Sequence, residues 1–414
     1  MELLNFSTSH NKKLFVVGGT LRDYLSRKPC SDFDLTGKNA AEVGANFSRA
    51  LNFTYVPLDK TPGRKTARVI LDQNQHLDFT DLQGRNIEED LSHRDFTINA
   101  MSLPLSEFLS GQKGIIDPYK GQEDFINKKI RVLQGPIFSS DPLRMLRAFR
   151  FAATLNFEID ADTLTAISLH KEKLSESAAE RIWHELTLLF KAPETLPSIK
   201  TMHDCGLLDC LFPNSGIALT QYEKVESLLK DPKDSFPEYA DKFNTSNFLE
   251  KHYLLKLSAL KSAAESCNLC LSNAESQIVE QALSGAKSLA QIYLKGSPDL
   301  NETYELTKSI HEELLASIIL FNTGSEEPDV VERTLFCNRI LKFYYDQFLP
   351  ATSEKPLLNG EDIIHQFQLS PSPLFGRILN DIQKAQVLGN IATPEDAIAL
   401  ARDIIQSQTK ESNE

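Results

Sequence analysis

The chain has 414 residues, of which 41% are hydrophobic and 24% are charged, so it is longer than one ordinary domain core. No apolar run approaches the length of a membrane span and the first residues do not resemble a signal peptide, so we expect a cytoplasmic protein without membrane segments. The net charge of −13 argues against a nucleic-acid partner, but residues 1–200 hold 26 of the 44 Lys and Arg and 26 of the 57 Asp and Glu. The acidic excess therefore lies entirely in the second half, and residues 144–150, which are rich in arginine, can still provide a local basic surface.

The predicted elements change in character along the chain. The first hundred residues alternate short apolar strands with helices, which predicts a small mixed α/β domain. Its predicted strands are residues 13–19, 32–36, 53–58, 67–71 and 76–82, and its predicted helices are residues 20–27 and 40–51. From about residue 136 the strand pattern disappears, and helical periodicity is clearest over residues 142–155, 178–191 and 222–230. The fold class is therefore an α+β head followed by an all-α remainder.

A glycine pair lies where the first strand meets the first helix. Gly18 and Gly19 allow the backbone to approach a phosphate, the helix N-terminus adds partial positive charge, and Arg22, one turn further, can reach a triphosphate. By itself a Gly-Gly turn is as well explained as a tight corner.

Asp32 and Asp34 follow on the second strand, where side chains two residues apart point to the same side. Two carboxylates there repel each other unless a cation lies between them, and a pair of Mg²⁺ ions would activate an attacking hydroxyl and neutralise a triphosphate. For an isolated Asp-x-Asp, an exposed acidic strand end is the simpler explanation. Asp78, on a neighbouring strand, is a third candidate carboxylate, although an ordinary strand position explains it equally well.

Several motifs in order carry a family resemblance. Gly-Gly-x-x-Arg-Asp followed by Asp-x-Asp resembles the signature of the DNA polymerase beta superfamily. Residues 89–100, Glu-Asp-Leu-Ser-His-Arg-Asp-Phe-Thr-Ile-Asn-Ala, are similar to a motif of class II tRNA nucleotidyltransferases and bacterial poly(A) polymerases, with His93 in place of its first arginine. Further similar segments are residues 117–124, 141–153, 179–186, 356–362 and 373–377. Directly before the 141–153 segment, Ser140 stands where the family usually has Glu.

The resemblance implies an architecture and roles for residues. It implies a nucleotidyltransferase head (1–135), a helical nucleotide-recognition neck (136–200), a helical body (201–350) and an RNA-binding helical tail (351–414). It implies that an RNA 3′-hydroxyl attacks the α-phosphate of CTP or ATP, with the tRNA 3′ end as partner and Mg²⁺ as cofactor. The implied metal ligands and catalytic residues are Asp32 and Asp34. The implied nucleotide-binding residues are Gly18, Gly19, Arg22, Arg94, Asp141, Arg144, Arg147 and Arg150.

Base selection without a template has a physical basis in one helix. Asp141 can accept a hydrogen bond from the exocyclic amine of cytosine or adenine, and Arg144, one turn later, can donate to ring acceptors. Uracil and guanine present an acceptor where that amine would be. An ordinary solvated Asp/Arg pair is the alternative outside this motif context.

The sequence leaves open which nucleotides the protein adds. Full CCA-adding relatives have a longer flexible segment before the Arg-Asp-Phe-Thr motif, and relatives that add only C have a shortened one. Only residues 81–86 intervene here, which favours CC addition over terminal A or full CCA addition. The alternative functions are a poly(A) polymerase, an RNA-binding protein that has lost catalysis, and a metal phosphohydrolase, for which His203-Asp204 is the only matching dipeptide.

Overall fold

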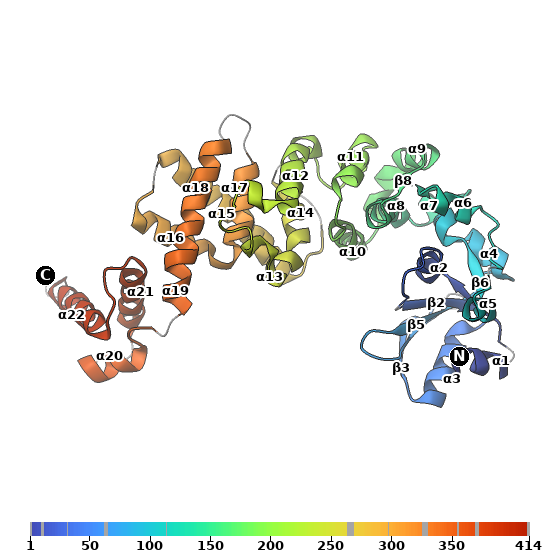
Figure 1. Ribbon diagram of the computed structural model, residues 1–414, viewed down its shortest axis with the longest axis horizontal. Coiled ribbons are helices and arrows are strands. Elements are labelled where there is room, and N and C mark those ends of the chain that lie inside the picture. The colour runs from blue at the N-terminus through green and yellow to red at the C-terminus, as the bar shows by residue number, and fades with distance from the viewer. Residues whose placement is uncertain are drawn as a thin grey trace. The chain divides into compact units, whose positions relative to one another are not determined.

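The computed structural model divides the chain into two compact units. The N-terminal unit comprises residues 1–213 with 268–270, and the C-terminal unit comprises residues 214–267 and 271–414. Figure 1 shows the strands gathered in the N-terminal unit. The structure describes residues 2–9, 12–30, 32–61, 65–112, 114–262, 269–296, 298–324, 330–353, 356–368 and 372–411.

A six-stranded mixed sheet organises the N-terminal unit. Its strand order is β3-β4-β5-β2-β1-β6, in which only β2 and β5 are parallel neighbours. The strands form because their apolar residues alternate or run continuously, and all four residues of β1 are buried. The strands are β1 (Leu14–Val17), β2 (Asp32–Gly37), β3 (Thr54–Asp59), β4 (Thr66–Ile70), β5 (His76–Asp81) and β6 (Ser102–Pro104).

Helices of the head pack around this sheet. Figure 1 shows α1 (Glu2–Ser9) beside α3 (Ala40–Leu51) against the sheet, and the rings of Phe6 and Phe47 meet edge to face at 5.6 Å. Leu35 on β2, Val43 on α3 and Phe79 on β5 belong to one buried cluster. Because Leu35 points into this core, Asp34 must project from the other face of β2.

The remaining elements of the N-terminal unit are mostly helices, as the sequence predicts. They are α2 (Gly18–Leu25), α4 (Ile87–Ser92), η1 (Thr97–Asn99), α5 (Leu105–Ser110), α6 (Gly121–Ile126), α7 (Ile137–Ser140), α8 (Leu143–Leu155), α9 (Ala161–His170), η2 (Lys171–Glu176), α10 (Ala179–Phe190) and α11 (Leu196–Asp204). One detail differs from the expected all-α neck. A two-residue strand, β8 (Glu158–Ile159), pairs in parallel with β7 (Lys129–Ile130) and ties the segment after α8 to the end of the head.

The C-terminal unit is helical throughout its described residues. Its α-helices are α12 (Ser215–Lys230), α13 (Ser246–Glu250), α14 (His252–Lys261), α15 (Asn273–Lys295), α16 (Leu300–Ile310), α17 (Leu314–Thr323), α18 (Val330–Phe343), α19 (Leu349–Ser353), α20 (Gly360–Phe367), α21 (Pro373–Val387) and α22 (Pro394–Glu411). Short 3₁₀ turns and a π-helical turn, Tyr344–Phe348, connect some of them. The predicted fold class, a small mixed sheet followed by helices, is confirmed.

Candidate active site

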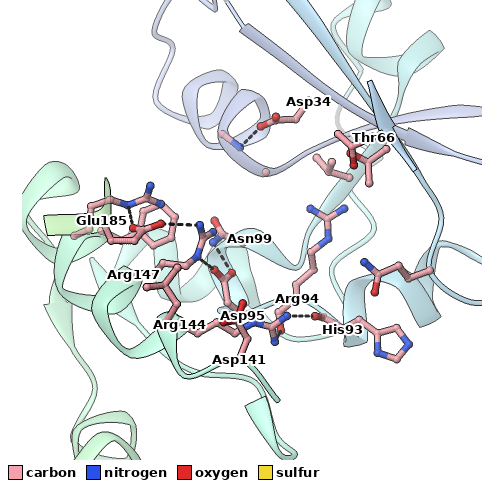
Figure 2. Close-up of a pocket in the computed structure, with 18 of the residues that line it drawn as sticks. Asp34, Thr66, His93, Arg94, Asp95, Asn99, Asp141, Arg144, Arg147 and Glu185 are labelled. Atoms are coloured by element: carbon pink, nitrogen blue, oxygen red, sulfur yellow. Dashed lines mark hydrogen bonds and ion pairs between the residues drawn. The ribbon is translucent and has the colours of Figure 1, made fainter. Parts of the chain in front are cut away.

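A cavity of about 780 Å³ lies in the N-terminal unit and gathers most of the predicted site residues. One wall comes from β2, β4, β5 and the start of α2, and the other from α4, α8 and α10. Figure 2 shows Asp34 and Thr66 on the sheet side and Asp141, Arg144, Arg147 and Glu185 on the helical side. The predicted residues in its walls are Gly18, Gly19, Arg22, Asp34, Arg94, Asp141, Arg144, Arg147 and Arg150.

The glycine turn is built around Asp34. The amide of Gly19 donates a hydrogen bond of 2.8 Å to Oδ2 of Asp34. Gly18 has a φ of +59°, and a side chain there would place its Cβ 2.8 Å from the same oxygen, so glycine is required twice over. Burial raises the pKa of Asp34, although the Gly19 amide and Arg22 oppose that rise.

Asp32 lies on the same face of β2 but outside the cavity walls. Its side chain is 59% exposed, and its Oδ1 is 3.0 Å from Nδ1 of His76 on β5. The two carboxylates offer the hard oxygen ligands that a divalent cation prefers, and such a cation would offset the cost of burying the charge of Asp34. The acidic pair therefore fits a divalent metal in its donor chemistry.

Three arginines surround one aromatic ring deeper in the cavity. The guanidinium carbons of Arg22, Arg147 and Arg150 lie 4.9, 5.3 and 4.2 Å from the ring centroid of Phe151. Arg22 also donates to the side-chain oxygen of Asn99. Burial lowers the pKa of Arg150 to about 10, so this cluster of cations is costly unless anions lie nearby.

Two buried carboxylates supply that balance. Asp95 Oδ2 accepts a 2.8 Å hydrogen bond from Arg147 Nε, and Glu185 lies 3.4 Å from Arg147 Nη1 and 3.2 Å from Arg150 Nε. Although burial acts to raise the pKa of Asp95, Arg147 and the Asn99 amide together lower it to about 2. These ion pairs hold α8 against both α10 and the turn after α4.

The predicted base-reading residues lie at the entrance of α8. Pro142 precedes the first turn, where its missing N–H leaves no helical hydrogen bond unmade. Arg144 donates to the backbone carbonyls of His93 (3.0 Å) and Arg94 (3.4 Å). Asp141 lies 3.1 Å from Nη2 of Arg181 on α10, so it has a cationic partner that the spacing to Arg144 does not reveal.

Arg94 projects into the space between the base-reading residues, Asp141 and Arg144, and the sheet (Figure 2). Its Nη2 is 2.9 Å from Oδ2 of Asp90, one helical turn earlier, and Asp90 also accepts the amide of Gln83. The cavity walls hold six arginine and six carboxylate side chains, so these walls are formally neutral at pH 7. A bound triphosphate would therefore need further positive charge, which a metal ion provides.

Some cavity residues have no place among the predicted site residues. Among them are Asp90, Asp95, Asn99, Phe151, Arg181 and Glu185. Asp90 stands four residues before Arg94, a spacing that favours an ion pair on a helix and is visible in the sequence. The pairing of Glu185 with two arginines of another helix has no such signal, because the residues are separated by more than thirty positions.

The fold and the site together define a nucleotidyltransferase, and comparisons with known proteins agree. Family models match residues 64–131 ("Poly A polymerase head domain"), 156–215 ("Probable RNA and SrmB-binding site of polymerase A") and 331–401 ("tRNA nucleotidyltransferase domain 2 putative"). Over these segments the chain resembles the family of tRNA nucleotidyltransferases and bacterial poly(A) polymerases. Nucleotidyltransferases of this family generally use a divalent metal.

The relatives span nearly the whole chain. A CC-adding tRNA nucleotidyltransferase of Geobacter sulfurreducens is 29% identical over 92% of this chain and 89% of its own length. An A-adding tRNA nucleotidyltransferase of Deinococcus radiodurans is 26% identical over 94% of each chain. The fold is similar to that of the Thermotoga maritima CCA-adding enzyme complexed with tRNA, with a TM-score of 0.68 and 22% identity over 98% and 94% of the two chains. Within the described residues, no helix combines the length and apolar character needed to cross a membrane.

Proposed function

We propose that this protein adds nucleotides from CTP and ATP to the 3′ end of tRNA without a template. The observation that supports it is the cavity itself. One wall holds the glycine turn and Asp34, which suit phosphate and metal chemistry, and the facing wall holds Asp141 and Arg144, which suit the edge of a base. A single nucleotide could therefore engage both walls at once. We also propose a cytoplasmic location, where tRNA and free nucleotides are available.

Different residues of the cavity would bind the triphosphate, contact other phosphates and hold the metal ion. The turn at Gly18 and Gly19 brings the backbone close to the triphosphate, which Arg22 binds, and Arg147 and Arg150 contact nucleotide or RNA phosphate from the helical side. Asp32 and Asp34 would hold Mg²⁺, which when bound helps to activate the attacking hydroxyl and to neutralise the leaving pyrophosphate. The preformed pairs Arg147–Asp95 and Arg94–Asp90 hold these cations in place before substrate arrives.

Base choice would depend on Asp141 and Arg144. The carboxylate of Asp141 accepts from the exocyclic amine of C or A, and Arg181 fixes the orientation of that carboxylate. Arg144 is tethered to the carbonyls of His93 and Arg94, so the base-reading group and the nucleotide-supporting Arg94 share one backbone segment. Mutation of Asp141 can therefore change base selectivity without removing a metal ligand, whereas a change at Arg144 also affects the backbone that carries Arg94.

Within this function we favour CC addition. The connection from the end of β5 to Ile87 is short, and hydrogen bonds restrain it: the amide of Leu82 donates to the Gly37 carbonyl, that of Gln83 to Asp90, and that of Arg85 to Glu89. A connection restrained in this way differs from the longer flexible segment implied for full CCA-adding relatives. Relatives named as CC-adding, such as that of Geobacter sulfurreducens, support the same choice.

The family resemblance also motivates a division of labour along the chain. We propose residues 1–135 as the catalytic head, 136–200 as the nucleotide-recognition neck, 201–350 as the body and 351–414 as the RNA-binding tail. A family model for domain 2 of tRNA nucleotidyltransferases, which matches residues 331–401, supports a separate module at the end of the chain. Poly(A) synthesis is not favoured, because the named relatives add C, A or CCA to tRNA.

The test uses three tRNA substrates, one lacking CCA, one ending in C and one ending in CC, each incubated with a single labelled nucleotide. CC addition predicts two cytidines on the first, one on the second, and no adenosine on the third. Adenosine on the third substrate would assign terminal A or full CCA addition instead. Repeated adenosine on any RNA would assign a poly(A) polymerase, and no incorporation at all would leave an RNA-binding role.

A further inference from the structure

Three polar side chains on β4 and β5 stand beside the acidic pair of β2. The register of the sheet places Asp34 beside Asp78, Asp78 beside Arg68, and Asp32 beside His76. None of these three neighbours belongs to the glycine turn or to the base-reading helix. The sheet therefore gathers three carboxylates and two basic side chains on one face.

Asp78 is already engaged by Arg68. Both oxygens of Asp78 accept hydrogen bonds from Arg68, from Nε to Oδ1 and from Nη2 to Oδ2, each at 2.8 Å. The hydrogen bonds to Asp78 raise the pKa of Arg68, and the negative charges of Asp32 and Asp34 act in the same direction. A two-point pair of this kind uses the oxygens that a metal ion would otherwise bind.

His76 stands between the exposed carboxylate and this pair. Its Nδ1 is 3.0 Å from Oδ1 of Asp32, and its Nε2 is 4.0 Å from Oδ2 of Asp78. The His76 side chain is 21% exposed and the Asp32 side chain is 59% exposed. Among the described residues, His76 is the one side chain that forms an ion pair with Asp32. Within the described part of the chain, no three His, Cys, Asp or Glu side chains are arranged as a metal cluster.

We infer that the metal site uses two carboxylates only, that His76 positions Asp32 for the metal, and that Arg68 withholds Asp78 from it. The inference rests on the metal site of the proposed function. An imidazole that donates to one oxygen of a ligating carboxylate fixes the direction of the other oxygen, as outer partners of metal ligands generally do. The positive charge of Arg68 offsets the negative charge of Asp78 on this face of the sheet. It therefore lowers the affinity for a cation and disfavours a cation bound at Asp78.

The experiment measures Mn²⁺ binding to the full-length protein without nucleotide or RNA, by the loss of the electron paramagnetic resonance signal of the free ion. His76→Ala should raise the apparent Kd at least about tenfold, the lower end of the range known for outer partners of metal ligands. His76→Asn, which keeps a donor near the position of Nδ1, should stay within about twofold of wild type. Arg68→Gln should tighten binding at least about threefold, because it releases the charge of Asp78.

The double variant Arg68→Gln/Asp78→Asn tests the third carboxylate. It removes a cation and an anion together, so the net charge of the face is kept, and Mn²⁺ affinity should stay within about twofold of wild type. A loss as large as that of Asp32→Asn would make Asp78 a ligand and overturn the inference. So would an unchanged Kd in His76→Ala, or wild-type binding no stronger than that of Asp32→Asn/Asp34→Asn.

Thermal unfolding of each variant separates loss of metal binding from loss of fold. Because the binding assay contains no tRNA and no nucleotide, its result is independent of nucleotide transfer. The expected Mn²⁺ pattern combined with absent incorporation would count against the proposed function alone. Normal incorporation combined with the wrong Mn²⁺ pattern would count against this inference alone.

Discussion

At the residue scale, the cavity contains side chains that are unfavourable in isolation and favourable in pairs. Asp34 is the clearest case, since burial raises its pKa while the Gly19 amide and Arg22 act against that rise. A carboxylate whose pKa is raised by burial destabilises the folded protein at neutral pH relative to a neutral side chain. A carboxylate at this unfavourable position beside the Gly18–Gly19 turn indicates a role in binding a ligand rather than in stabilising the fold.

Removal of this carboxylate should separate activity from stability. Asp34→Ala, or Asp34→Asn with the volume kept, should lower nucleotide incorporation by at least about 100-fold, because a lost metal ligand is worth several kcal/mol in the transition state. The free energy of unfolding should stay the same or rise, because a costly buried charge has gone. Urea unfolding and incorporation are measured on the same preparations, and Asp32→Ala should lower incorporation in the same way with little change in stability, because the Asp32 side chain is 59% exposed. Wild-type turnover in either variant would remove both residues from the metal site.

Base selection makes a second prediction at this scale. Asp141→Ala should weaken discrimination against UTP and GTP by about 1–3 kcal/mol while incorporation persists, because the acceptor for the exocyclic amine is lost. Arg181→Ala should cause a smaller loss, below about 1 kcal/mol, because this half-exposed partner only orients Asp141. Competition between labelled CTP and UTP measures both, and Glu176→Ala provides a carboxylate removal outside the cavity. Full selectivity in Asp141→Ala would reassign the start of α8 to holding phosphates.

At the element scale, local patterns predict the strands and helices well and the contacts between them poorly. The predicted strand 76–82 and helix 142–155 correspond closely to β5 (His76–Asp81) and α8 (Leu143–Leu155), because apolar spacing decides both. The partner of Asp141 could not be predicted, because Arg181 lies forty residues away on α10. The short strand β8 escaped prediction for the same reason, since two residues carry no periodicity and only pairing with β7 defines them.

The joint between the turn after α4 and helix α8 depends on one buried ion pair. Asp95 is nearly fully buried, and Arg147 and Asn99 hold its pKa near 2 despite its burial. Since its folded pKa lies below the unfolded value of about 3.9, its contribution of about 2–3 kcal/mol is present above pH 4 and is lost as the pH falls toward 2.

Asp95→Asn should therefore destabilise the N-terminal unit by about 3 kcal/mol at pH 6 and remove that part of the acid dependence. The measurement is urea unfolding at pH 6 and pH 3, followed by fluorescence of Trp183 on α10, the one tryptophan of the chain. Asp204→Asn, an exposed carboxylate at the end of α11, is the matched control. Equal destabilisation of wild type and Asp95→Asn between the two pH values would show that another group carries the dependence.

At the scale of the whole molecule, the two halves of the chain differ in charge. The first 200 residues are balanced in charge, and the surplus of 13 negative charges lies beyond them. The C-terminal unit also contains a half-buried histidine, His252, whose Nε2 is buried and has no hydrogen-bond partner among the described residues. Burial, helped by the nearby charge of Lys256, lowers the pKa of His252 to about 4.

The C-terminal unit should therefore lose stability at a higher pH than the N-terminal unit. His252 is neutral in the folded chain, whereas the unfolded chain takes up a proton below about pH 6.5, so the stability it contributes is full above pH 6.5 and falls toward pH 4. Because His252 is partly open to solvent, the loss is about 1–2 kcal/mol rather than the full value of the shift.

Thermal unfolding is measured at pH 7 and pH 4.5. At the lower pH, the loss of helix followed by circular dichroism should move to lower temperature, while the Trp183 transition, which reports on the N-terminal unit, moves less. His252→Gln should remove most of the difference, and His365→Gln, which alters an exposed histidine of the same unit, should not. If both transitions shift equally in wild type and in His252→Gln, the acid sensitivity does not reside in this histidine.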